Sequence, residues 1–95
     1  MDVEFVVVAT GLRFPEGPVW MADGSLIVTE LIGKRLTRID LRSGSAQTLA
    51  EIPGSPNGAA IGPDGALYIC NSGGWRYTDL GGLLVPGDHH GTPAP

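Results

Sequence analysis

An internal repeat constrains the fold of this chain more than any other feature of its sequence. Residues 15–30 return 41 positions further along as residues 56–71, and five aligned positions are identical. Most of the other aligned positions exchange one apolar residue for another. A repeat of about 40 residues that holds several short strands is typical of a β-propeller blade. We therefore predict an all-β fold of the β-propeller class.

The pattern within the repeat predicts one complete blade at about residues 11–52 and a partial blade at about residues 53–71. Asp23-Gly24 lies between two apolar runs and favours a tight hairpin, because glycine accepts the positive φ that the turn requires. Alternation at residues 35–41 indicates a third strand, and residues 45–52 supply a fourth. The second copy stops after two strands, so we expect about one and a half to two blades.

Two further segments flank these blades. Val3–Ala9 is rich in β-branched residues and predicts an additional strand, of the kind that completes the final blade of a closed propeller from the other end of the chain. Residues 72–95 hold six of the fifteen glycines and three of the eight prolines. We predict that this segment is a long inserted loop, because it lacks a clear alternation of polar and apolar residues.

Composition narrows the classes of partner. The 95 residues suit one small domain, and with 42% hydrophobic and 17% charged residues they are too apolar for a disordered tail. A net charge of −4 without a basic cluster argues against nucleic acid and favours cations or neutral molecules. The single Cys70 suits a reducing compartment, and the apolar run near the N-terminus is too short for a membrane span. We expect a cytoplasmic protein with no membrane partner.

The repeat also picks out a candidate metal site. Glu16 and Asn57 begin equivalent strands of successive blades, where they converge on the propeller axis, and each is preceded by proline and followed by glycine. Carboxylate and amide oxygens are hard ligands that suit Ca²⁺, Mg²⁺ or Mn²⁺. Gly17 and Gly58 then predict a close approach of backbones beside a crowded axis. The alternative is that Glu16 and Asn57 only cap turns.

Three weaker candidates lie elsewhere. Asn71 takes the repeat position of Glu30, and it either faces the pocket or caps the turn that follows it. His89 and His90 offer nitrogen ligands, although adjacent histidines on a Gly/Pro-rich loop diverge and are more typical of a solvated loop. No serine lies in a nucleophile-elbow motif.

A family resemblance rests on two stretches of sequence. The first is the run from Gly11 to Trp20 followed by residues 23–28, and the second is Pro56-Asn57-Gly58 followed by residues 62–68. Both resemble the regucalcin (senescence marker protein)/gluconolactonase/luciferin-regenerating enzyme family over roughly residues 5–80. The resemblance implies a six-bladed propeller with one divalent cation, Ca²⁺ or Zn²⁺, on its axis. It also implies hydrolysis of sugar lactones and related esters.

The same resemblance suggests roles for individual residues. Glu16 matches the metal-binding glutamate of the family, and Asn57 matches an axial asparagine that touches metal, substrate or neither in different family members. The loop with His89 and His90 would cover the pocket and touch substrate. The remaining ligands and the catalytic aspartate belong to later blades, so the catalytic residues are unknown. The chain looks like the N-terminal third of such a protein, either a truncated reading frame or a fragment.

Two classes of function follow from these observations. The first is a metal-dependent lactonase, of which the isolated chain would be an inactive part that self-associates. The second is a non-catalytic propeller that binds a ligand or partner, because a fold alone does not imply chemistry. A propeller of the strictosidine-synthase type is a weaker third, since it would not need an axial glutamate.

Overall fold

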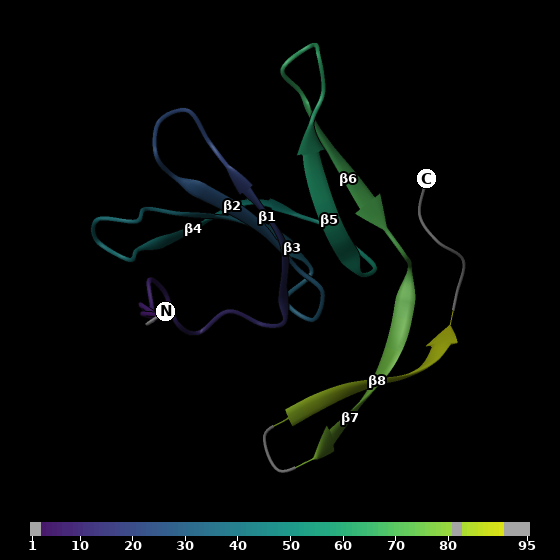
Figure 1. Ribbon diagram of the computed structural model, residues 1–95. Helices are drawn as coiled ribbons and strands as arrows, with labels where there is room; N and C mark the ends of the chain where they lie inside the picture. Colours follow the sequence, from purple (N-terminus) through teal and green to yellow (C-terminus); the bar gives the residue numbers. More distant parts are fainter. Residues whose placement is uncertain (1–2, 81–82, 91–95) are drawn as a thin grey trace.

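The computed structural model describes residues 3–80 and 83–90, with side chains described as far as Gly73. Within these residues the chain forms eight strands in three antiparallel sheets and no helix (Figure 1). A membrane-crossing helix is accordingly absent from the described part of the chain. The strands are β1 (Pro15–Trp20), β2 (Leu26–Glu30), β3 (Arg35–Ile39), β4 (Ala46–Glu51), β5 (Pro56–Ile61), β6 (Leu67–Asn71), β7 (Gly74–Leu80) and β8 (Leu83–His90).

Strands β1 to β4 form a four-stranded sheet in chain order, which is the complete blade that the sequence predicts. The predicted hairpin between β1 and β2 turns at Asp23-Gly24. The Asp23 carboxylate fixes this turn by accepting hydrogen bonds from the backbone N–H of Ser25 at 2.9 Å and from its hydroxyl at 2.6 Å. The aspartate that helps to predict this turn from the sequence therefore also stabilises it in the structure.

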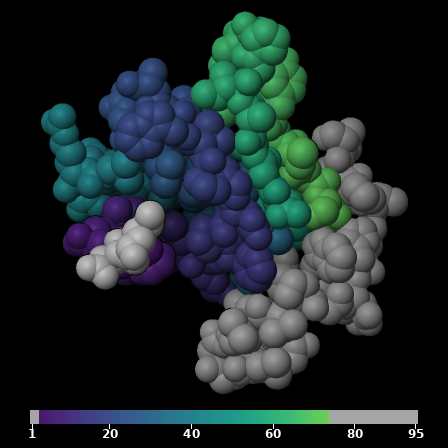
Figure 2. Space-filling model, viewed as in Figure 1, coloured from purple at the N-terminus to yellow at the C-terminus, as the bar shows by residue number. Residues whose placement is uncertain are grey.

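Strands β5 and β6 repeat this hairpin in a two-stranded sheet, which is the predicted partial blade. The Asp64 carboxylate accepts the backbone N–H of Ala66 at 3.1 Å, as Asp23 does from Ser25 in the first copy. The hairpin stands beside the first sheet, and its tip projects separately from it (Figure 2). The repeat in sequence is thus a repeat in structure.

The hydrophobic core lies in the first blade. Ile27, Val28, Leu36 and Ile39 are all buried there, on the two central strands β2 and β3. By contrast, every residue of the outer strand β4 is exposed. The centre of the first sheet is therefore buried, whereas its outer edge is open to solvent.

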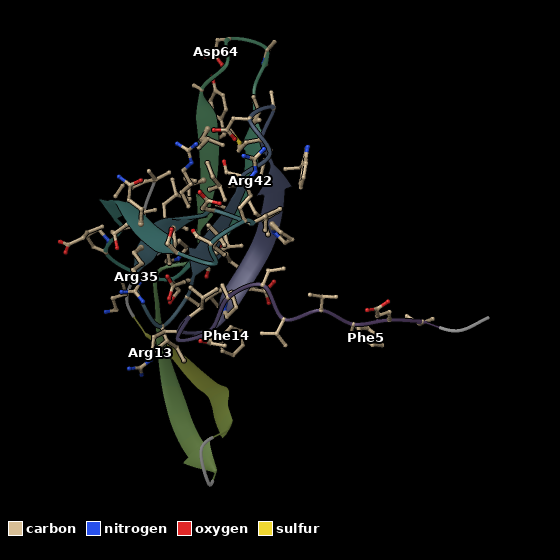
Figure 3. All side chains as sticks on the ribbon, turned by 90° about the vertical axis from the view of Figure 1, so that its left-hand side faces the viewer. Phe5, Arg13, Phe14, Arg35, Arg42 and Asp64 are labelled. Carbon is tan, nitrogen blue, oxygen red and sulfur yellow. The ribbon has the colours of Figure 1, made fainter. Side chains whose placement is uncertain are left out.

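The predicted strand at Val3–Ala9 does not form. These residues belong to no strand, and the ring of Phe5 is 91% exposed on a segment that runs away from the body of the protein (Figure 3). A β-branched sequence favours an extended backbone, but a strand also requires a neighbouring edge with free N–H and C=O groups. In the described part of the chain, no edge pairs with this segment.

The predicted loop at residues 72–95 is also wrong for most of its length. β7 and β8 form an antiparallel hairpin in which Leu80 lies opposite Leu83 and Thr78 lies opposite Val85. The hairpin forms its own sheet and does not extend β5–β6. Glycine and proline interrupt the alternation of residues that would predict these strands from the sequence. Pro86 is nevertheless part of β8, where it lies opposite Tyr77. Residues 91–95 lie outside the described part of the chain.

Candidate functional site

The site begins with a contact between two glycines of neighbouring blades. β1 and β5 lie side by side, and a Cβ atom added to Gly17 would stand only 2.8 Å from the Cα atom of Gly58. No real Cβ atom tolerates such a distance from backbone, so the two strands can approach this closely only because residue 17 is glycine. The predicted need for glycine at a close approach is confirmed at Gly17, whereas at Gly58 an added Cβ atom would meet nothing within 4 Å.

Glu16 and Asn57 directly precede these glycines, and both are exposed. A β-bulge interrupts both hairpins at the corresponding point, after Glu16 in β1 and after Pro56 in β5. Bulges bend a strand and re-aim its side chains, and they are common beside active sites. Glu16 and Asn57 are thus the second residues of two adjacent first strands, β1 and β5.

The backbone of Glu16 is held from inside the blade. Thr29, which is fully buried and lies opposite Glu16 in the β1–β2 ladder, donates its hydroxyl hydrogen to the Glu16 carbonyl oxygen at 3.0 Å. The N–H of Leu31 donates to the carbonyl oxygen of Phe14 at 3.0 Å, which ties down the segment just before β1. The backbone of Glu16 is thus held in place, and the residue is exposed to solvent.

Glu30, the next residue along β2, forms a buried ionic network. Its carboxylate accepts two hydrogen bonds from the Arg35 guanidinium, at 2.6 and 2.9 Å, and one from the backbone N–H of Arg13 at 2.6 Å. The hydroxyl of Thr37 is a further donor to the same carboxylate. Figure 3 shows Arg13 and Arg35 on the same side of the blade.

Two opposing effects act on the pKa of Glu30. Burial favours the neutral acid, but the hydrogen bonds from Arg35, the Arg13 backbone and Thr37 outweigh it, so the pKa lies below its ordinary value of 4.5. Glu30 is therefore ionised at neutral pH and fully paired. It anchors the chain that leads into β1 and offers no free oxygen to a ligand.

Asn71 takes the corresponding position in the second blade and has a similar structural role. Its side-chain oxygen accepts the N–H groups of Ser55 and Gly73, both at 3.0 Å, and its amide nitrogen donates to the carbonyl oxygen of Pro53 at 2.7 Å. Of the two alternatives for Asn71, the geometry shows the turn cap. It ties the segment before β5 to the end of β6.

Residues 14–85 match the protein family described as the SMP-30/Gluconolactonase/LRE-like region. The chain belongs to this family. Among solved structures it is similar to the PQQ-bound form of aldose sugar dehydrogenase from Streptomyces coelicolor, with 27% identity and a TM-score of 0.64. That match covers 84% of this chain but only 30% of the dehydrogenase chain. A search of curated proteins found no significant match.

The gluconolactonase-like family implies a divalent cation, so the donor set must be tested against one. Glu16 and Asn57 supply a carboxylate and an amide oxygen, which are the ligands that hard cations prefer. In the described part of the chain, no side chain hydrogen-bonds to the Glu16 carboxylate, so its oxygens are available to a ligand. No group of three or more His, Cys, Asp or Glu side chains gathers among the described residues. The donors fit in kind, and this chain would supply part of a coordination shell.

The two histidines lie in a β-strand and not in the predicted loop. His89 and His90 end strand β8, where their backbones lie opposite Trp75 and Gly74 of β7. Their side chains lie outside the described part of the structure. A role for either histidine toward metal or substrate therefore stays a prediction.

A groove of about 430 Å³ lies on the outer part of the first blade, away from the two glycines. Among its lining residues are Lys34, Arg35 and Glu51, but neither Glu16 nor Asn57. The Arg35 guanidinium is already bound to Glu30, which weakens its attraction for an anion. The groove is therefore a weaker candidate for the functional site than the N-terminal end of β1.

Thr29 is the residue that sequence reasoning missed. Its signal was weak but present: it is a hydroxyl residue within an otherwise apolar run, directly before the charged residue Glu30. In the repeat its counterpart is Cys70, which cannot form the same hydrogen bond as strongly. The two copies therefore differ at this position as well as at Glu16 against Asn57.

Proposed function

We propose that this chain supplies the first blades of a metal-dependent hydrolase that acts on sugar lactones or related esters. One observation carries the proposal. The exposed Glu16 carboxylate stands at the end of β1, next to the contact between Gly17 and Gly58, where the first strands of two blades meet. Membership of the gluconolactonase-like family supports the same reading.

In this proposal each residue has a limited role. Glu16 would bind the cation directly, and Asn57 would contribute an amide oxygen to the cation or to the substrate. Thr29 would hold the Glu16 backbone so that the carboxylate meets its ligand at little entropic cost. A bound divalent cation supplies Lewis-acid polarisation of a carbonyl group and lowers the pKa of a bound water.

A second candidate is sugar oxidation with a quinone cofactor. The similarity to a PQQ-bound aldose sugar dehydrogenase favours it. At 27% identity and a TM-score of 0.64, this similarity is one of sequence as well as of fold. Both candidates act on sugars or their derivatives. They differ in chemistry, because the first consumes water and the second transfers electrons.

The test uses a complete propeller, because the chain spans 30% of the length of the dehydrogenase it matches. In a chimera, residues 1–95 replace the first blades of a gluconolactonase of the family, and circular dichroism and thermal melting verify that it folds. We expect hydrolysis of a sugar lactone that disappears with EDTA and returns with Ca²⁺ or Zn²⁺. The Glu16→Gln variant should lose this activity, whereas Glu51→Gln, the same change at an exposed residue of β4, should not.

The outcomes separate the candidates. Hydrolysis that is unaffected by EDTA and by Glu16→Gln contradicts the metal site. Reduction of a dye by the chimera with aldose and added PQQ, without lactone hydrolysis, supports the second candidate. Cation binding without either reaction would leave a non-catalytic binding propeller.

A further inference from the structure

Both blades fix the start of their first strand by the same backbone hydrogen bond. In the first blade the N–H of Leu31 donates to the carbonyl oxygen of Phe14 at 3.0 Å. In the second blade the N–H of Ser72 donates to the carbonyl oxygen of Ser55 at 3.1 Å. The two donors occupy equivalent positions of the repeat, and so do the two acceptors. In each blade, the residue after the second strand thus holds the residue before the first strand.

A side chain at the end of the second strand adds a further bond to the same segment. Glu30 ends β2, and Asn71, its repeat equivalent, ends β6. The Glu30 carboxylate accepts the backbone N–H of Arg13 at 2.6 Å. The side-chain oxygen of Asn71 accepts the backbone N–H of Ser55 at 3.0 Å. A charged residue in one blade and a neutral residue in the other therefore hold equivalent segments.

The two entry segments, residues 13–14 before β1 and residues 53–55 before β5, have unusual backbone conformations. Phe14 has a φ of 59°, in the left-handed region that residues with bulky side chains seldom adopt. Gly54 has a φ of 104°, and a Cβ atom added there would stand 2.5 Å from the side-chain oxygen of Asn71. A left-handed backbone at a residue such as Phe14 persists only where the surrounding contacts impose it, and such residues cluster at functional sites. The hydrogen bonds to the entry segments are contacts of this kind.

Each candidate metal ligand lies two residues beyond a residue that is held in this way. Glu16 follows Phe14 at this spacing, and Asn57 follows Ser55. Glu30 is fully buried, and Ser55 is nearly so. By contrast, Glu16 and Asn57 are exposed. Buried hydrogen bonds thus fix the backbone next to two exposed candidate ligands.

We propose that Glu30 and Asn71 are positioning residues of the axial metal site. Each fixes the entry segment of its own blade and thereby the backbone of one ligand, Glu16 in the first blade and Asn57 in the second. Neither positioning residue contacts the cation itself. A segment that is ordered before binding need not lose conformational entropy when the cation binds. The inference rests on the proposed function only for the identity of the two ligands.

Calorimetric titration of Ca²⁺ into the chimeric propeller tests the role of Glu30. We expect Glu30→Gln to weaken Ca²⁺ binding about tenfold, because binding must then order about one further backbone residue. The control Asp23→Asn removes a second ion pair of the same sheet, the one with Arg38, in the turn at the opposite end of β1. This control should bind Ca²⁺ as the unchanged chimera does, and circular dichroism verifies that both variants are folded during the titration. Equal affinity of the two variants overturns the role of Glu30.

A measurement without any substitution checks the same claim. In the unchanged chimera, the backbone N–H groups of Arg13 and Leu31 should exchange slowly with solvent before Ca²⁺ is added and should change little afterwards. The reason is that their hydrogen bonds already hold the first entry segment. Fast exchange that slows only when Ca²⁺ binds overturns the positioning role, since the cation itself would then order the segment.

Asn71→Ala tests the second blade. It should alter the same quantity that Asn57→Ala alters, either the Ca²⁺ affinity or the KM for the lactone. The two changes together should have no more effect than Asn57→Ala alone, because Asn71 acts through Asn57. A purely structural residue would instead add its own loss. Additive losses, or no effect of Asn57→Ala on either quantity, overturn the role of Asn71.

The positioning role and the proposed function fail in different ways. Unchanged Ca²⁺ affinity in Glu16→Gln contradicts Glu16 as a ligand, and with it the proposed function. Reduced affinity in Glu16→Gln beside unchanged affinity in Glu30→Gln overturns the positioning role of Glu30 alone.

Discussion

Gly17 and Gly58 hold the two blades at a distance that no other residue at position 17 would allow. The 2.8 Å between the Cβ position of Gly17 and the Cα atom of Gly58 joins the repeat to the candidate site, since Glu16 and Asn57 directly precede these glycines. The same contact sets the packing of the two blades and the positions of the two candidate ligands.

Replacing Gly17 with alanine should therefore destabilise the protein by more than its backbone angle explains. Gly24→Ala is the matched control, because Gly24 also has a positive φ but an added Cβ would meet nothing within 4 Å. We expect Gly17→Ala to cost about 1–3 kcal/mol more than Gly24→Ala in free energy of unfolding, the range for overpacking. Urea titration measures both, and equal losses would show that the contact contributes nothing.

Thr29→Val tests whether the backbone of Glu16 is held by the buried hydroxyl. The change keeps the shape of the side chain but removes the hydrogen bond to the Glu16 carbonyl oxygen. We expect a loss of about 1 kcal/mol in unfolding free energy. In the chimeric propeller we also expect weaker Ca²⁺ binding, measured by calorimetry. A stability loss without any change in cation affinity would limit Thr29 to a structural role.

The Glu30 network predicts how stability depends on pH. The pKa of Glu30 is lower in the folded than in the unfolded protein, so the unfolded chain takes up a proton first as pH falls. The stability from this carboxylate is complete above the ordinary value of 4.5 and is lost as pH falls through the lower, folded-state pKa. Thermal melting between pH 7 and pH 3 measures this loss.

Glu30→Gln supplies the comparison. At pH 7 we expect the variant to lose about 1–3 kcal/mol, because Arg35 keeps a partly exposed guanidinium and loses its anionic partner. The difference between the two proteins should narrow toward pH 3. A difference that stays constant over this range would show that the charge of Glu30 is not what stabilises the blade.

The sequence predicted correctly the turns whose hydrogen bonds join residues that are close together in the chain. The Asp-Gly turns at Asp23 and Asp64 form as expected because each aspartate bonds to the backbone two residues further on. The close approach at Gly17 and Gly58 was also predictable, because the repeat placed both glycines beside the same axis. The turn signals need no knowledge of distant partners, and for Gly17 the repeat itself indicates the partner.

The incorrect or ambiguous predictions concern strand pairing and hydrogen-bond partners, which the sequence does not show. Val3–Ala9 has the composition of a strand, but no described edge receives it. β7 and β8 pair with each other despite their glycines and Pro86, because a hairpin needs only facing backbones in register. Asn71 was ambiguous because an amide can bind a ligand or cap a turn, and the choice depends on the position of Ser55, sixteen residues away.

Calorimetric titration of Ca²⁺ into the chimeric propeller is the most direct test of Glu16 as a metal ligand. Loss of the carboxylate charge in Glu16→Gln should abolish or strongly weaken binding while the melting temperature without metal stays the same, because the side chain is exposed. Glu51→Gln, the same change at another exposed glutamate, should bind Ca²⁺ as the unchanged chimera does. Equal Ca²⁺ affinity in all three proteins would contradict the assignment and leave Glu16 as a turn residue.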